Sequence, residues 1–181
     1  SLFGIYNGLV DVYNGSYYSG MSPVNDGNWH FLGYSWNQAT QQLQLWVDGV
    51  LDGNFTTDLT VATTDRGSLG QEFDGLSISN QFNGSMAEIT IWNDVLSGPQ
   101  VNQLMLNPVT SSNPQYLNLV GYYNTISGCE WELKDRSSYN NNGITCSKIE
   151  HNHEVIPSFN NSDISFLWVS DALGVLSTST T

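Results

Sequence analysis

The residues best able to do chemistry form two small groups with the same spacing. Glu72 and Asp74 are two residues apart, so on a β-strand both carboxylates would point to one face, where they could bind a cation or act as acid and base. His151 and His153 repeat that spacing, and two imidazoles on one strand face suit a transition metal. The sequence offers the histidine pair no identifiable third ligand, so we expect a solvated edge strand there.

The rest of the sequence lacks the common catalytic arrangements. No Ser/His/Asp set, phosphate-binding glycine loop or dinucleotide fingerprint occurs in it. His30 lies between large apolar residues and is expected to be a hydrogen-bonded core histidine. Most tryptophans are expected in a core as well, whereas Trp131 lies among charged residues and is the best candidate for a ligand contact at the surface.

The overall charge restricts the partners. Seventeen acidic residues stand against four basic ones, which gives a formal net charge of −13. Nucleic acid is not an expected partner, because no basic stripe exists to neutralise phosphates, and anionic membranes are disfavoured for the same reason. No apolar run approaches about 18 residues, so we predict no membrane insertion.

Composition and cysteine usage indicate an exported protein. Asn, Ser, Thr and Gly are abundant and Lys is scarce, as in many secreted β-proteins. The two cysteines, Cys129 and Cys146, allow one bridge, and in an extracellular protein we expect that disulfide. Four Asn-x-Ser/Thr sequons are candidates for glycosylation, at Asn14, Asn54, Asn83 and Asn160, and turn-like contexts favour the first two. The predicted location is extracellular or at the cell surface.

The elements that position these residues are organised around one hairpin. Segment 29–36 has large residues at both parities, which predicts a strand covered on both faces. In segment 43–47, apolar residues alternate with Gln44 and Trp46, which predicts a strand with two different faces. Asp48-Gly49 indicates a tight turn after that strand. The apolar face of the hairpin requires a second layer to cover it.

One short helix is predicted near 98–106. Ser97 and Gln100 have the spacing of a capping box, and Pro99 is tolerated in a first helical turn. Val101 and the Leu104-Met105 pair then form an apolar stripe at helical spacing.

These segments together resemble the laminin G-like and pentraxin-like domains of the concanavalin A-like lectin/glucanase superfamily. Asp26-Gly-Asn-Trp-His30 followed by Leu45-Trp-Val-Asp-Gly49 is similar to the central hairpin of that family. Ser68-Leu-Gly70, segment 82–93 and Leu96-Ser97 continue the family pattern in order. The resemblance implies an all-β fold, an antiparallel jelly-roll β-sandwich of the concanavalin A-like type.

The resemblance also bears on chemistry at the acidic cluster. Related sandwich glycosidases use the pattern Glu-x-Asp-x-x-Glu, but here Ser77 takes the third acid position, and one acid cannot fill both catalytic roles. We therefore predict no catalytic residues and no enzyme. In pentraxins the matching segment binds calcium, which implies as ligands the carboxylates of Glu72 and Asp74, the carbonyl of Phe73 and the amide of Asn80. A hydrogen-bonded acidic loop without calcium is the alternative.

The last third of the chain resembles the beginning of the same family. Segments 119–123 and 133–144 resemble its first strand and loop, and segments 149–157 and 163–169 resemble the strands that follow. In the usual order these pieces precede the block that begins at Phe3. Three parts are therefore predicted: the back of a sandwich at 1–107, a connector at 108–118, and front strands at 119–175.

Neither part has enough strands to bury its own core, so each needs a complement. The segment with Ile164, Phe166 and Trp168 is predicted to supply it. That strand could fold back on its own chain, enter a neighbouring subunit to build a head-to-tail fibre, or belong to one window of a tandem array. The sequence leaves all three open.

We therefore expect a non-enzymatic, extracellular structural or adhesive module, a repeat or subunit of a surface protein or fibre. Its expected partners are identical or tandem copies of itself, joined by strand complementation. The alternative is a calcium-dependent carbohydrate-binding lectin module with glycans as ligands.

Overall fold

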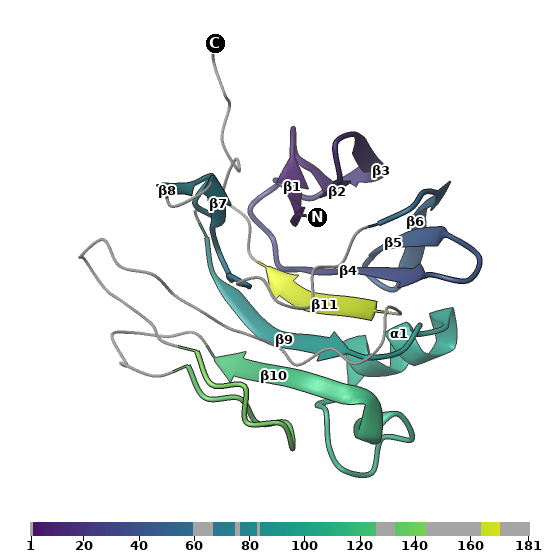
Figure 1. Ribbon diagram of the computed structural model, residues 1–181, viewed down its shortest axis with the longest axis vertical. Helices are drawn as coiled ribbons and strands as arrows, with labels where there is room; N and C mark the ends of the chain where they lie inside the picture. Colours follow the sequence, from purple (N-terminus) through teal and green to yellow (C-terminus); the bar gives the residue numbers. More distant parts are fainter. Residues whose placement is uncertain are drawn as a thin grey trace.

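The structure, a computed structural model, describes residues 2–59, 67–74, 77–82, 84–125, 133–143 and 164–170. In chain order the elements are β1 (Leu2–Tyr6), β2 (Leu9–Tyr13), β3 (Tyr17–Pro23), β4 (His30–Asn37), β5 (Gln42–Val47), β6 (Val50–Thr56), β7 (Glu72–Asp74), β8 (Ser77–Ser79), β9 (Met86–Trp92), α1 (Gly98–Leu106), a 3₁₀ turn (Tyr116–Asn118), β10 (Leu119–Thr125) and β11 (Ile164–Ser170) (Figure 1). For residues 73–74, 77–78, 125 and 164–170 the backbone alone is described.

The strands form two facing sheets and a separate hairpin. The large sheet has the order β10-β9-β11-β4-β5-β6, the small sheet has the order β1-β2-β3, and β7 pairs with β8. All of these pairings are antiparallel. The predicted concanavalin A-like β-sandwich with one short helix is confirmed.

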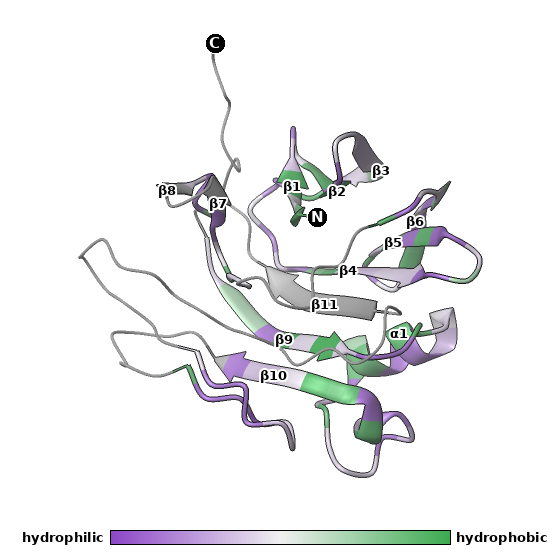
Figure 2. Cartoon of the chain, viewed as in Figure 1, coloured by the Kyte–Doolittle hydropathy of each residue, from purple (hydrophilic) through white to green (hydrophobic). Residues whose placement is uncertain are grey.

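The inner core lies between the two sheets and follows from the two-residue period of the strands. The apolar residues of β4 and β5 that share one parity pack here with those of β2: Leu32, Tyr34, Trp36, Leu43, Leu45, Val47, Val10 and Val12. Figure 2 shows apolar stretches in strands of both sheets. The other parity of these strands faces away from this core, because side chains alternate between the two faces of a sheet.

The opposite face of the large sheet is covered by α1. Phe31, Trp46 and Trp92 of the sheet pack there with Leu96 and Val101. Both faces of β4 are therefore buried, which explains its large residues at both parities. At the start of α1 the backbone N–H of residue 97 donates to the side-chain oxygen of residue 100 at 2.7 Å, as the predicted capping box requires. Within the described ranges, no helix has the length and apolar character needed to cross a bilayer.

Strand β11, far along the chain, lies between β9 and β4 (Figure 1). Its register with β4 pairs Ile164 with Trp36, Phe166 with Tyr34, and Trp168 with Leu32. Its other edge pairs with β9. The segment expected to complement a sheet therefore lies in the sheet of its own chain, while the division at 1–107, 108–118 and 119–175 stays a prediction.

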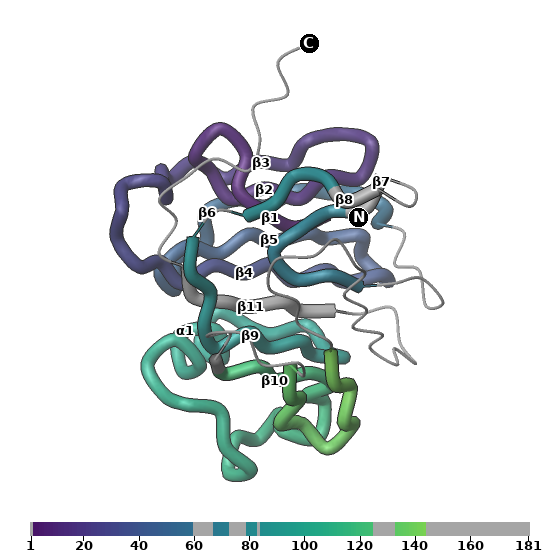
Figure 3. Tube along the Cα trace, turned by 90° about the vertical axis from the view of Figure 1, so that its left-hand side faces the viewer, coloured from purple at the N-terminus to yellow at the C-terminus, as the bar shows by residue number. Residues whose placement is uncertain are grey.

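The loop 133–143 is fixed against β10 by one buried aspartate. The carboxylate of Asp135 accepts hydrogen bonds from the backbone N–H groups of Tyr122, Ser137 and Asn141, each at 2.8 Å, and from the Ser137 hydroxyl at 2.7 Å. Hydrogen bonds to an ionisable carboxylate are stronger than those between neutral groups, so this residue fixes the loop to the strand. Figure 3 shows this loop with β10 at the end of the molecule away from the small sheet.

Candidate functional site

The outer face of the small sheet carries a group of tyrosines. Val10 and Val12 of β2 belong to the inner core, so Asp11 and Tyr13 take the outward parity. The register of β2 with β3 sets Tyr13 opposite Tyr17 and Asp11 opposite Ser19. Tyr6, at the end of β1, completes the group. We call Tyr6, Tyr13 and Tyr17 the tyrosine surface.

The three rings of the tyrosine surface are in contact. The ring centroids of Tyr6 and Tyr17 are 4.3 Å apart with planes 13° from parallel, and those of Tyr13 and Tyr17 are 4.8 Å apart at 46°. Tyr17 is 55% exposed and Tyr13 is 37% exposed. Because the rings stack on one another and stand on paired strands, they lose little conformational entropy when a partner binds.

A buried carboxylate lies beside these rings. Asp11 is only 4% exposed and accepts a hydrogen bond from the Ser19 hydroxyl at 2.6 Å. Desolvation raises the pKa of Asp11, and the Ser19 hydrogen bond offsets this only in part. Desolvation, with Tyr6 as the next cause, also raises the pKa of Tyr17. The site is therefore an aromatic layer next to a carboxyl group that burial shields from water.

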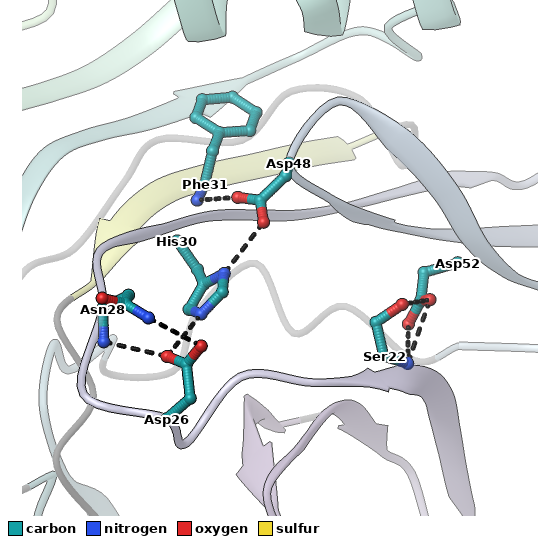
Figure 4. Close-up of polar contacts among 7 residues, drawn as sticks. All are labelled: Ser22, Asp26, Asn28, His30, Phe31, Asp48 and Asp52. Atoms are coloured by element: carbon teal, nitrogen blue, oxygen red, sulfur yellow. Dashed lines mark hydrogen bonds and ion pairs between the residues drawn. The ribbon is translucent and has the colours of Figure 1, made fainter.

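A second polar group lies at the start of β4 (Figure 4). His30 Nδ1 is 2.8 Å from an Asp48 carboxylate oxygen, and His30 Nε2 is 3.0 Å from an Asp26 oxygen. Asp48 also accepts the Phe31 backbone N–H at 2.9 Å, and Asp26 accepts both amide groups of Asn28 at 2.8 Å. The expected hydrogen bonds of His30 are confirmed, but the ring is not fully buried in a core: it lies at the end of the sheet, because both of its partners come from the connections that flank β4 and β5.

Both nitrogens of this imidazole are occupied, so its role is to join two connections. Partial burial lowers the pKa of His30, but the hydrogen bonds and charges of Asp48 and Asp26 outweigh it and leave the pKa raised. Hydrogen bonds from Asn28 and His30 lower the pKa of Asp26 to about 2. Among the described residues, no three His, Cys, Asp or Glu side chains are grouped to hold a metal ion.

Comparison with known proteins places this architecture in a family. A laminin G model, described as the Concanavalin A-like lectin/glucanases superfamily, matches residues 3–102. The chain belongs to this superfamily.

Two curated relatives contain a segment similar to this superfamily domain. The "Sushi, von Willebrand factor type A, EGF and pentraxin domain-containing protein 1" of Rattus norvegicus is 32% identical over 154 residues, which cover 78% of this chain. The protein of the same name from Mus musculus is 33% identical over 144 residues, or 74% of this chain. The chain spans 4% of the length of each relative. No solved structure matches it.

The calcium ligands expected in this superfamily domain fall on the β7–β8 hairpin and the residue after it. The Asn80 amide nitrogen donates to a Glu72 carboxylate oxygen. Ser79 pairs with Glu72 in the register, and its buried hydroxyl has no hydrogen-bond partner among the described residues. The side chains of Phe73 and Asp74 lie outside the description. The contact of Glu72 with the Asn80 amide is the kind expected of a hydrogen-bonded acidic loop, and calcium, which needs about six to eight oxygens, stays a prediction here.

Only some of the other residues singled out from the sequence lie in the part of the chain that the structure describes. Outside the described residues lie Cys129, Cys146, Trp131, His151, His153, Asn83 and Asn160. Of the two favoured sequons, Asn54 is exposed on the edge strand β6, whereas Asn14 is half-buried. The tyrosine surface was not predicted from the sequence. Part of its signal was present, because Tyr13 alternates with Val10 and Val12 along one strand and so faces the opposite way.

Proposed function

We propose that this superfamily domain is a non-catalytic, extracellular recognition module that serves adhesion within a larger protein. The tyrosine surface carries the proposal, since exposed, mutually stacked rings stand on three paired strands. Such rings give a large contact area at a low entropic cost, which is why tyrosine is common in binding surfaces. The relatives' names, which join sushi, EGF and pentraxin domains, support a place within a multidomain chain.

The surroundings of Glu72 support a role without catalysis. Glycoside hydrolysis needs two carboxylates, one on each side of the scissile bond. Of the side chains described around Glu72, the Asn80 amide and Ser79, which is paired with it, are not acids, and Asp74 of the same strand has its side chain outside this description. Ser77, at the start of β8, takes the position where a further acid would stand.

The test is solid-phase binding of the purified chain to extracellular matrix and to intact cells, with a polysaccharide hydrolysis assay in parallel. We expect saturable binding and no release of reducing sugar. The matched variants are Tyr17→Ala, which should reduce binding, and Tyr139→Ala, an exposed tyrosine on the distant loop 133–143, which should not. Hydrolysis of any polysaccharide, or equal binding by both variants, would contradict the proposal.

A calcium-dependent lectin is the second candidate. It is favoured by the contact of Glu72 with Asn80 and by the Ser79 hydroxyl beside them, which has no hydrogen-bond partner in the described part of the chain. Glycan-array binding that disappears with a chelator and with Glu72→Gln would support it. Binding that persists under both conditions would show that glycan binding does not require calcium.

For assembly we propose exchange of β11 between copies. Both edges of β11 are paired, and the strand is separated from the loop 133–143 by residues 144–163, enough chain to reach a neighbour. A neighbour's β11 could make the same pairings head to tail. Light scattering should show monomers at low concentration and larger species after incubation at high concentration, and monomers throughout would refute the exchange.

A further inference from the structure

The charges around the tyrosine surface favour a positively charged partner over a negatively charged one. The whole chain has a net charge of −13. The two basic residues in the described part of the chain, Lys134 and Arg136, lie on the loop beside β10, away from the small sheet (Figure 3). Among the described residues, the basic side chains therefore lie far from the tyrosine surface, and the carboxylates near it attract a cation and repel an anion.

Two carboxylates lie close to the rings themselves. Asp11 is opposite Ser19 and close enough to Tyr17 for its charge to raise the pKa of that hydroxyl. Asp58 is exposed. Its backbone carbonyl accepts a hydrogen bond, at 2.9 Å, from the side-chain amide of Asn14, the residue that follows Tyr13, so Asp58 lies at the rim of the tyrosine surface. One carboxylate is thus desolvated next to the rings and another is in solvent at their border.

Aromatic faces and nearby negative charge together favour one kind of group. A ring face attracts a cation through its quadrupole, and a guanidinium does this best because it is planar and weakly hydrated. A guanidinium stacked on Tyr17 would also bring a positive charge close to the desolvated Asp11, which gains more from it than a well-hydrated carboxylate would.

From this geometry we propose that the tyrosine surface docks an arginine-rich segment of a partner protein. The guanidinium groups stack on the part of the Tyr13 and Tyr17 rings that their neighbours leave exposed, and the charges of Asp11 and Asp58 hold them there. Anionic ligands are repelled by this surface, and neutral ones gain nothing from its charge. The proposal deepens the recognition role proposed above by naming its partner.

The experiment measures the anisotropy of a labelled Arg-Gly repeat peptide titrated with the intact chain, at low and at high salt. We expect saturable binding that weakens as the salt concentration rises, and weaker binding of the matching Lys-Gly peptide. Tyr17→Ala should weaken binding about five-fold, while Tyr17→Phe keeps it within about two-fold, because phenylalanine retains the ring face. Asp11→Asn, which keeps the size of the side chain, should weaken binding about three-fold.

The control is Tyr139→Ala, whose side chain is 41% exposed far from the small sheet and which should bind like the unaltered chain. Thermal unfolding of each variant verifies the fold. Equal binding by Tyr17→Ala and the unaltered chain, or salt-sensitive binding indifferent to every tyrosine, would overturn the proposal. Binding of a neutral glycan in place of the peptide, lost in Tyr17→Ala, would overturn it while leaving the recognition role intact.

Discussion

A disulfide between β4 and β11 would test the pairing on which the large sheet depends. Ser35 and Ser165 are directly opposite in the register of these strands. Opposite residues of antiparallel strands have Cα atoms about 4.5–5.5 Å apart, inside the range that a disulfide spans. The Ser35 hydroxyl accepts a long, 3.5 Å hydrogen bond from the Trp46 indole, which is weak, so Ser35→Cys should cost little.

The expected stabilisation follows from the size of the closed loop. The bridge would close a loop of roughly 130 residues, for which the loss of unfolded-state entropy predicts about 5 kcal/mol of added stability. With an m-value of about 2.5 kcal/mol/M for a domain of this size, the urea midpoint should rise by about 2 M on oxidation.

The assay compares oxidised and reduced Ser35→Cys/Ser165→Cys by urea titration, with peptide mapping to identify the bridge. The control pair is Ser35→Cys/Ser170→Cys, because Ser170 pairs with His30 and lies about 17 Å further along the strand. We expect a bridge within one chain for the first pair and none for the second. Failure of the first pair to bridge at all would refute the placement of β11, and bridging only between chains would show that β11 is exchanged.

Three further predictions concern the polar contacts. Gly20→Ala should lower the free energy of unfolding by about 3 kcal/mol and the melting temperature by about 10 °C. A Cβ at this position would lie 2.0 Å from a carboxylate oxygen of Asp52, the residue of β6 that accepts hydrogen bonds from β3. An unchanged melting temperature would contradict this prediction. The pKa of His30 is raised above its ordinary value of about 6.5. Its stabilising contribution is therefore complete below that pH and is lost as the pH rises through the pKa of the folded state. Urea titrations at several pH values should show this decline for the unaltered chain and not for His30→Gln, and parallel profiles would refute it. Calcium should raise the melting temperature of the chain, and a chelator should reverse that rise. In Glu72→Gln the rise should be absent, and an equal rise in this variant would exclude Glu72 as a ligand.

The hairpin of β4 and β5 could be predicted because its pattern is local. Alternation in 43–47 fixes which residues share a face, and large residues at both parities in 29–36 require two covering layers. The resemblance to a known family then supplied the sandwich. These local patterns do not show which distant strands are neighbours in the sheet. The position of β11 between β9 and β4 of its own chain was therefore only one of three possibilities.

The two polar features that were misjudged or missed share one physical cause. His30 has apolar neighbours along the chain, but its ring meets Asp26 and Asp48 only after both connections converge at the end of β4. The rings of Tyr6 and Tyr17 come from strands that are not adjacent in the sheet, and nothing local shows that they stack. Contacts of this kind are set by the fold and not by spacing in the sequence.

The position of β11 also governs when the sheet can form. Residues 164–170 leave the ribosome after every other strand described here, yet they lie between β9 and β4 in the middle of the large sheet. Until they emerge, the pair β10-β9 and the group β4-β5-β6 have no common neighbour and each presents a bare edge. Synthesis must therefore have passed residue 170 before the two halves of the sheet are joined, and a nascent chain stalled before residue 164 should depend on chaperones to avoid aggregation.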